Sequence, residues 1–87
     1  MKIIFSKKYD KSFDKLPLKI QKLAIIAESE VIEANSINEI FQLKPLRKKD
    51  FYSINIGNSY RIGIKIRNDE VIFISVGHRS DIYSKFP

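Results

Sequence analysis

The apolar positions in the first part of the chain predict a short strand followed by a helix. Residues 1–6 are typical of a strand, because Ile3, Ile4 and Phe5 form a short apolar run. Ser6 then offers an oxygen that can cap a helix. The next apolar residues recur at the i, i+4 and i+7 positions of one helical face: Tyr9, Phe13 and Leu16.

A proline separates this helix from a second one. Pro17 breaks the first pattern and suits the first turn of a new helix, which should extend from residue 18 to about residue 34. Its apolar residues recur at helical spacing in a broad stripe: Ile20, Leu23, Ala24, Ile25, Ile26, Ala27, Val31 and Ile32. Two consecutive helices joined by a tight turn predict a helical hairpin.

The second half of the chain has the period of two that is typical of strands. An irregular segment, residues 35–50, comes first, and we expect Phe41, Leu43 and Leu46 to anchor it to the core. Turns at residues 57–59 and 68–69 then divide the rest, up to residue 77, into three strands. Their alternation predicts an isoleucine-rich face that packs on the helices and an opposite face that is open. The sequence therefore predicts an α+β fold, in which an N-terminal strand and a helical hairpin pack on a mainly antiparallel four-stranded sheet.

Length and composition limit the possible classes of protein. Eighty-seven residues indicate a single domain, residues 1–87, with a small core. The chain has no cysteine and one histidine, His78, so we expect neither a disulfide nor a metal or other cofactor. No apolar run approaches the roughly 18 residues of a membrane-spanning helix, and the N-terminal run is too short for a signal peptide. We therefore expect a soluble cytoplasmic protein with no membrane partner.

The charge of the chain indicates an anionic partner. Sixteen Lys and Arg residues against ten Asp and Glu residues give a net charge of +6, with an isoelectric point near 9.7. Such basicity favours a nucleic acid, an acidic protein or a membrane surface as the partner. The alternative is a lysine-rich surface that is merely solvated, so the position of the charges must decide.

The predicted open face combines cations with aromatic rings. Strand alternation places on it these residues, together with the basic run that leads into the sheet: Arg47, Lys48, Lys49, Ser53, Asn55, Arg61, Lys65, Arg67, Phe73 and Ser75. Cations contact phosphates and aromatic rings stack on unpaired bases, so this composition favours RNA binding. Two alternatives remain, because an uncovered sheet face is usually polar and a protein partner could cover Phe51 and Phe73.

Four residues at or near this face are candidates for catalysis. His78 could transfer a proton to a leaving 5′-oxygen, although a single histidine after a strand is more often structural. The guanidinium groups of Arg61 and Arg79 could stabilise a phosphorane-like transition state, or could pair with a carboxylate such as that of Asp81. Tyr83 could contact a base or simply anchor the C-terminal segment.

Several motifs along the chain resemble those of the RelE/ParE superfamily of toxins. They are the Lys15-Leu16-Pro17 bend, the segment Leu43-Lys44-Pro45-Leu46, the pair Tyr60-Arg61 and the closing run Ser75-Val76-Gly77-His78-Arg79-Ser80-Asp81-Ile82-Tyr83. The resemblance extends over essentially the whole chain, and its most specific parts are Tyr60-Arg61 and residues 77–83. It implies a RelE-like, microbial RNase-like fold.

The resemblance also implies an activity and partners. RelE-type members are metal-independent endoribonucleases that cleave mRNA in the ribosomal A site. The 2′-OH attacks the adjacent phosphorus and leaves a 2′,3′-cyclic phosphate and a 5′-hydroxyl. An acidic antitoxin, usually encoded beside the toxin, covers the active face.

The matched positions suggest residue roles, with one departure from the family pattern. Arg61 and Arg79 match family arginines that stabilise the transition state, Tyr83 matches the C-terminal tyrosine, and His78 lies where some relatives have the acid. Ser53 and Asn55, however, stand where RelE has lysines. Residues 43–46 also lack the glutamate that acts as the base in YoeB-like members.

The departure leaves two alternatives to a RelE-like mRNA interferase. One is a ParE-like protein that blocks DNA gyrase without hydrolysis, which the loss of the two strand cations favours. The other is a catalytically weakened relative that acts only as a binding module.

Overall fold

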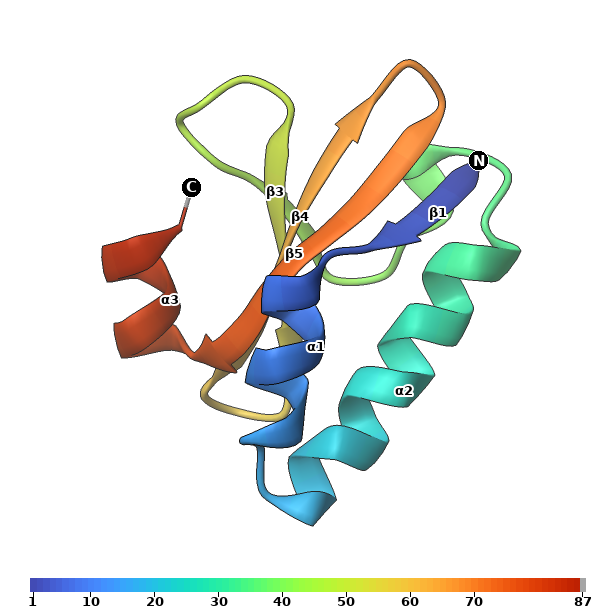
Figure 1. Ribbon diagram of the computed structural model, residues 1–87. Coiled ribbons are helices and arrows are strands. Elements are labelled where there is room, and N and C mark those ends of the chain that lie inside the picture. Colours follow the sequence, from blue (N-terminus) through green and yellow to red (C-terminus); the bar gives the residue numbers. More distant parts are fainter. Residues whose placement is uncertain (87) are drawn as a thin grey trace.

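The computed structural model describes residues 1–86, without the side chains of residues 83–85. Two consecutive helices follow the first strand, and most of the sheet comes after them in the chain (Figure 1). In chain order they are β1 (Lys2–Phe5), α1 (Lys7–Asp14), α2 (Leu18–Glu33), a 3₁₀ turn (Ile37–Glu39), β2 (Leu43–Pro45), β3 (Phe51–Ile56), β4 (Tyr60–Arg67), β5 (Glu70–His78) and α3 (Arg79–Lys85). The predicted helical hairpin and three-strand meander are both present.

The sheet has five strands in the described chain, one more than predicted. Its order is β1-β5-β4-β3-β2, with β1 parallel to β5 and every other pair antiparallel. The additional strand is β2, which pairs with β3 within the segment that we predicted to be irregular. Pro45 is compatible with this strand because β2 lies at the edge of the sheet, where a missing N–H breaks no ladder bond. The α+β class is confirmed and the strand count is corrected.

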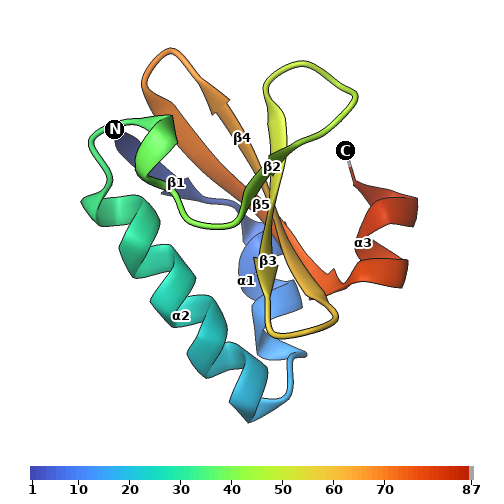
Figure 2. The same ribbon diagram turned by 180° about the vertical axis from the view of Figure 1, so that it is seen from behind.

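The helices divide the sheet into two unlike faces. α1 and α2 lie on one face, and α3 lies on the other (Figures 1 and 2). On the hairpin side, the small residues Ala24 and Ala27 of α2 are buried, which lets the helix approach the sheet closely. The core on this side also holds Val31 and the central isoleucines Ile62 and Ile64, all of them fully buried. No helix in residues 1–86 is long and apolar enough to cross a membrane.

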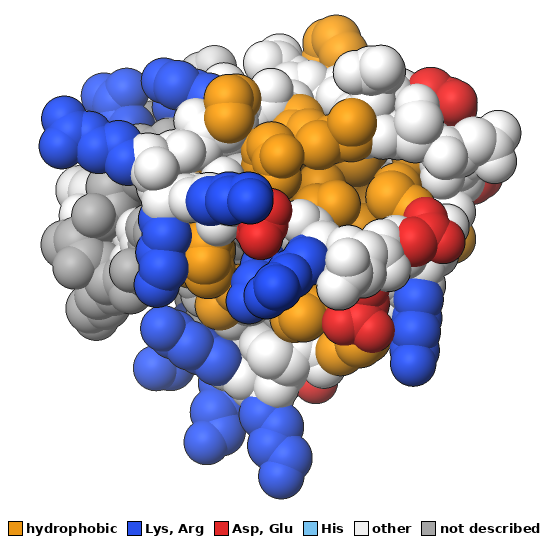
Figure 3. Space-filling model, turned by 90° about the horizontal axis from the view of Figure 1, so that it is seen from above, with side chains coloured by type: hydrophobic (Ala, Val, Ile, Leu, Met, Phe, Trp, Pro, Cys, Tyr) orange, Lys and Arg blue, Asp and Glu red, His pale blue; other side chains and the backbone are white. Residues whose placement is uncertain are grey.

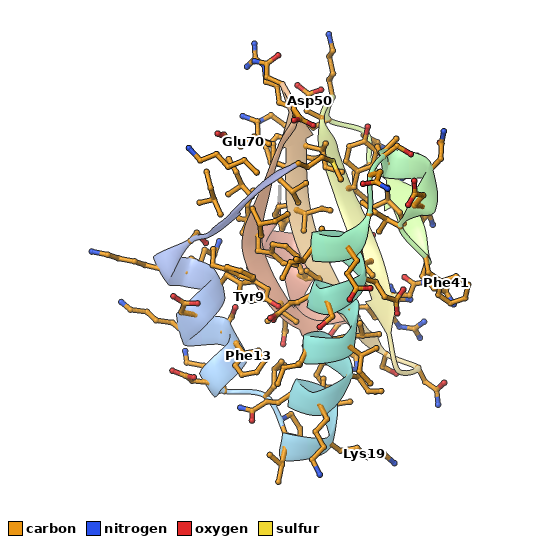
Figure 4. All side chains as sticks on the ribbon, turned by 90° about the vertical axis from the view of Figure 1, so that its right-hand side faces the viewer. Tyr9, Phe13, Lys19, Phe41, Asp50 and Glu70 are labelled. Atoms are coloured by element: carbon orange, nitrogen blue, oxygen red, sulfur yellow. The ribbon has the colours of Figure 1, made fainter. Side chains whose placement is uncertain are left out.

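Some residues that were predicted to be buried face solvent instead. Ile25, Ile26 and Ile32 lie on the outer side of α2, each more than half exposed. Phe41 is 68% exposed and points away from the sheet in Figure 4, so it does not anchor its segment. Leu43, which points toward the hairpin side beside Ile54, serves as the anchor in its place.

A bulge in β5 changes which side chains face the helices. Gly63 pairs with Ser75 but Ile64 pairs with Phe73, so Ile74 is an extra residue in β5. Before the bulge, the alternation of β5 is therefore opposite to the predicted one. Phe73 faces the hairpin and is fully buried, which overturns its predicted place on the open face. Its ring stacks on Phe5 at 4.7 Å and meets the ring of Tyr9 edge-on at 5.3 Å.

Two serines of the α1 segment hold the bulged part of β5. Ser6 caps α1 by accepting a hydrogen bond from the N–H of Tyr9, and its hydroxyl also donates to the carbonyl of Ile74 at 3.0 Å. The Ser12 hydroxyl accepts a hydrogen bond from the N–H of Val76, also at 3.0 Å. The pairing with β1 ends at Phe73, so α1 satisfies backbone groups of β5 that a longer β1 would otherwise bind.

Tyr9 links the two helices of the hairpin. Its side chain is 2% exposed, and its hydroxyl donates to Oε2 of Glu28 at 2.6 Å. Burial raises the pKa of Tyr9, and the hydrogen bond to Glu28 and its negative charge raise it further. The phenol therefore stays neutral in the folded protein well above its usual range.

Replacing Tyr9 by Phe should lower the free energy of unfolding at neutral pH. It should also reduce the decrease of this free energy at alkaline pH. At pH 7 the loss of a hydrogen bond to a carboxylate should cost about 1.5 kcal/mol. Because the folded pKa is raised, Tyr9 contributes its full stabilisation below about pH 10, and the contribution declines at higher pH as the unfolded chain ionises. The decline attributable to Tyr9 should reach about 1.4 kcal/mol by pH 11 and should be absent from Tyr9→Phe. Urea unfolding at pH 7, 9 and 11 measures it; equal declines in both proteins would contradict this assignment.

Candidate functional site

The face opposite the hairpin carries three rows of cross-strand neighbours. Across β3, β4 and β5, Asn55 lies beside Arg61 and Gly77, and Ser53 beside Gly63 and Ser75. The third row contains Phe51, Lys65 and Ile72. Opposed residues in antiparallel strands point to the same face with Cβ atoms about 5 Å apart, so these side chains share one surface. The predicted placement of Ser53, Asn55, Arg61 and Lys65 is therefore confirmed.

The centre of this face is covered by α3. Phe86 is 5% exposed, and its ring lies so close to Gly63 that a Cβ atom there would come within 2.8 Å of it. Ser53 is fully buried and Ser75 is 8% exposed. Ser53 was predicted to contact RNA, and the structure leaves it no exposed surface because the Phe86 ring lies over its row. The accessible parts of the face lie around α3 and not at its centre.

Arg61 and Asn55 form a polar pair with unused hydrogen-bonding capacity. Nη1 of Arg61 donates to the carbonyl of Tyr60 at 2.8 Å, which holds the guanidinium against the sheet. Nε of Arg61 and Oδ1 of Asn55 are both buried and lack a hydrogen-bond partner among the described residues. Buried polar atoms are nearly always paired, and such exceptions often mark a place where water or a ligand binds. A donor and an acceptor are therefore available side by side on this face.

Two lysines and an aromatic ring lie at the other end of the same face. Nζ of Lys48 lies 5.1 Å and Nζ of Lys65 lies 5.5 Å from the centre of the Phe51 ring, within the range of a cation–π interaction. The ring of Phe86 meets the Phe51 ring edge-on at 5.5 Å. Cations thus gather beside α3, and Figure 3 shows Lys and Arg side chains along that side of the molecule.

The remaining predicted cations lie at the rim. Arg47 and Lys49, like Lys48, belong to the exposed loop between β2 and β3. Arg67 is exposed beside Glu70, at the end of β4 far along the strand from Arg61. In residues 1–86, no three His, Asp or Glu side chains are arranged to hold a metal ion.

Lys44 was missed by the sequence analysis. It pairs with Ser53 across β2 and β3, so the pleat places its exposed side chain on the same face. The proline at position 45 led us to predict an irregular segment there. The signal that could have found it is the alternation of Lys44 with the apolar residues Leu43 and Pro45. Lys44 supplies a positive charge one strand away from Ser53, where the family pattern has a lysine.

His78 does not belong to the group around Arg61. It pairs with Tyr60, so its ring leaves the sheet on the face opposite to Arg61, and it meets the Tyr60 ring edge-on at 5.5 Å. Nδ1 of His78 accepts a hydrogen bond from the N–H of Ser80 and caps α3, with the Ser80 hydroxyl 2.9 Å away. The predicted single cluster of Arg61 and His78 is therefore corrected to two separate locations.

The other two catalytic candidates lie in α3. Arg79 is its first residue, is exposed, and donates its N–H to the carbonyl of Ser59 at 2.7 Å. Tyr83 lies in the same helix, but its side chain is outside the described residues.

Substitutions at His78 should separate its capping role from any role of its ring. Asn preserves an N-cap acceptor, whereas Ala removes it, so His78→Ala should lower the free energy of unfolding by about 1 kcal/mol and His78→Asn should change it little. Thermal unfolding followed by circular dichroism measures the difference. Equal losses in both variants would show that the ring contact with Tyr60, and not the cap, is what stabilises the chain end.

Comparison with known proteins places the chain among the toxins of type II toxin–antitoxin systems. The family model described as "ParE toxin of type II toxin-antitoxin system, parDE" matches residues 3–83. The chain is 36% identical to Toxin RelE3 of Methanocaldococcus jannaschii, with 100% of each sequence covered. It therefore belongs to the RelE/ParE superfamily of toxins, and this relative is of the RelE type.

Solved structures agree with this assignment. The toxin chain in the RelB–RelE antitoxin–toxin complex from Methanococcus jannaschii superposes with a TM-score of 0.80 at 34% identity, covering 97% of this chain and 99% of that one. The isolated Escherichia coli RelE toxin superposes with a TM-score of 0.71 at 26% identity, covering 97% and 92%. The fold and the toxin family are thus both supported by RelE structures.

Proposed function

We propose that this toxin is an endoribonuclease that cleaves mRNA in the ribosomal A site. The observation that carries the proposal is the pair of buried, unpartnered atoms, Nε of Arg61 and Oδ1 of Asn55, on a face that also holds Lys44, Lys48 and Lys65. A guanidinium offers two donors in a fixed fork, which matches two oxygens of one phosphate. The full-length likeness to RelE-type relatives supports the same activity.

The chemistry that we propose needs no metal. The 2′-oxygen of the ribose attacks the adjacent phosphorus, and the bond from phosphorus to the 5′-oxygen breaks. The products are a 2′,3′-cyclic phosphate and a 5′-hydroxyl, with one proton removed from the 2′-OH and one added to the leaving oxygen. Negative charge builds on the phosphate oxygens between these events, and preorganised donors lower the barrier by stabilising it.

Each side chain receives a role from its position. Arg61 stabilises the charge that develops on the phosphate, and the Asn55 amide orients the ribose or phosphate beside it. Arg79, at the start of α3, contributes a second cation. For Tyr83 we keep the role that the resemblance implies, a contact to a base. Lys44, Lys48, Lys65 and the loop cations Arg47 and Lys49 attract the RNA backbone. His78 is left out of this group because its ring lies on the other face.

We also propose that a cognate acidic antitoxin neutralises the toxin. The Methanococcus jannaschii RelE toxin forms a complex with the antitoxin RelB, and this chain carries a net charge of +6. An acidic partner would complement the charge of the cations beside α3. The exposed isoleucines of α2, Ile25, Ile26 and Ile32, are apolar surface that the same partner would bury.

Replacing Arg61 by Ala should lower the rate of mRNA cleavage by about 100-fold or more, the usual effect of removing one transition-state donor. Arg61→Lys should restore only part of the rate, because an ammonium lacks the planar fork. Primer extension on a reporter mRNA in a reconstituted translation reaction measures cutting. Lys19→Ala, which removes an exposed cation of α2, serves as the control, and circular dichroism verifies folding. Codon-phased cutting that persists undiminished in Arg61→Ala would contradict the proposal.

Replacing Lys44 by Gln should slow cleavage about fivefold at low salt, because an exposed charge contributes up to about 1 kcal/mol. The effect should shrink as salt screens the charge, and Lys44→Arg should retain the rate. The same translation reaction at two ionic strengths tests this, with Lys22→Gln as a control of equal charge. A loss that is independent of salt would show that Lys44 acts by packing.

The second candidate function is inhibition of DNA gyrase, which the match to the ParE family model favours. Expression in bacteria distinguishes the two. Nuclease activity predicts arrested translation with cut mRNA, whereas gyrase inhibition predicts DNA damage with intact mRNA. Growth arrest without mRNA cuts would overturn the proposed nuclease.

A further inference from the structure

A cavity of about 620 Å³ lies between α1 and α3, beside the end of β5, and Arg61 is not among the residues that line it. Leu16, Val76 and Ile82 contribute apolar surface to it. Three lysines, Lys8, Lys11 and Lys15, line it from the α1 side. Tyr60 and His78 line it at the end of the sheet. The cavity thus combines an apolar floor, two rings and a basic wall.

The spacing of these three lysines destabilises the helical segment that carries them. Lys8 and Lys11 are three residues apart, and Lys11 and Lys15 are four apart, so like charges are neighbours on one side of the α1 segment. Such pairs destabilise a helix by a few tenths of a kcal/mol each. The acidic residues of α1, Asp10 and Asp14, do not line the cavity. Asp81 is the only carboxylate that lines it in the described chain, so the three lysines leave an excess of positive charge that an anionic ligand would neutralise.

The two rings form a fixed aromatic surface beside these lysines. Tyr60 and His78 meet edge-on with their centres 5.5 Å apart. Nδ1 of His78 accepts a hydrogen bond from the N–H of Ser80, which fixes the orientation of the imidazole and places the proton of the neutral ring on Nε2. Half-buried rings next to lysines are the combination that binds single-stranded nucleic acid, because a base stacks on the rings while cations contact its phosphates.

We propose that this cavity binds one nucleotide of a single-stranded RNA, with the base against Tyr60 and His78 and the flanking phosphates on Lys8 and Lys11. The inference rests on the proposed function and adds a second RNA subsite to it. Tyr60 and Arg61 are consecutive residues whose side chains leave β4 on opposite faces. An RNA strand that passes around this end of the sheet can therefore place its scissile phosphate on Arg61 and a neighbouring nucleotide in the cavity.

The test uses a fluorescein-labelled, eight-nucleotide 2′-O-methyl RNA, which cannot be cleaved by attack of a 2′-OH. Fluorescence anisotropy measures its affinity for the full-length toxin at several salt concentrations. The pocket variant is Lys8→Gln with Lys11→Gln, and the control is Lys19→Gln with Lys22→Gln. Both pairs are three residues apart on exposed helical surfaces, and both variants have a net charge of +4, from +6 minus 2.

We expect the pocket variant to bind about tenfold more weakly at low salt. The slope of log affinity against log salt should decrease by about 1.4, since each phosphate contact of a single strand contributes about 0.7. The control should keep the slope of the unmodified toxin. Equal changes in the two variants would overturn the proposal, because the effect would then come from net charge alone. Absence of binding by the unmodified toxin at low salt would overturn it as well.

A variant of the aromatic surface provides a second readout. His78→Asn keeps the cap of α3 but removes the ring, so affinity should decrease about tenfold while the salt slope stays the same. An unchanged affinity in this variant would exclude stacking of a base on His78 and overturn the proposed position of the nucleotide.

The outcomes separate this subsite from the proposed nuclease. Loss of oligonucleotide binding in the pocket variant, in a toxin that cuts no mRNA, would support the subsite and reject the nuclease. Unchanged binding in the pocket variant, in a toxin that cuts mRNA, would reject the subsite and keep the nuclease.

Discussion

The extra residue in β5, Ile74, decides which side chains the sheet presents on each face. Without the bulge, strict alternation would turn Phe73 away from the hairpin and remove a fully buried ring from the core under α1. With it, Phe73 packs beneath Phe5 and Tyr9, while Ser75 and Gly77 keep their places beside Gly63 and Arg61. A one-residue shift reverses the face of every following side chain, so both the core and the functional face depend on this feature.

The bulge also lies where α1 is hydrogen-bonded to the C-terminal half of β5. The carbonyl of Ile74 accepts a hydrogen bond from the Ser6 hydroxyl, which also caps α1. The N–H of Val76 donates to the hydroxyl of Ser12, further along the same helix. These two bonds hold α1 against the free edge of β5. The lysines of α1 thereby come to line the same cavity as His78, which sequence spacing alone does not show because they are more than sixty residues apart.

The sequence predicted the elements whose signals are local. The helical hairpin, the meander and the turn at Asn68-Asp69, where both residues have positive φ, follow from periodicity and turn chemistry. The placement of Arg61 and Lys65 followed from the same alternation, since β3 and β4 are regular. The bulge at Ile74 has no local signal in an unbroken apolar run, so Phe73 was placed on the wrong face. His78 was grouped with Arg61 because the strand was expected to end at residue 77. β5 in fact extends through His78, and the regular alternation after the bulge places its side chain on the same face as Val76.

The packing of the chain end over the functional face bears on the small residue at position 53. Ser53 lies in one row with Gly63, and the ring of Phe86 fills the space above that row. A lysine at position 53 would place its ammonium beneath this ring, where an unpaired charge costs several kcal/mol. Lys44, on the neighbouring edge strand and exposed, offers a positive charge to the same face without that cost. The small residue at position 53 therefore fits the packing of Phe86 over the sheet, and Lys44 supplies a cation to the same face from the edge strand.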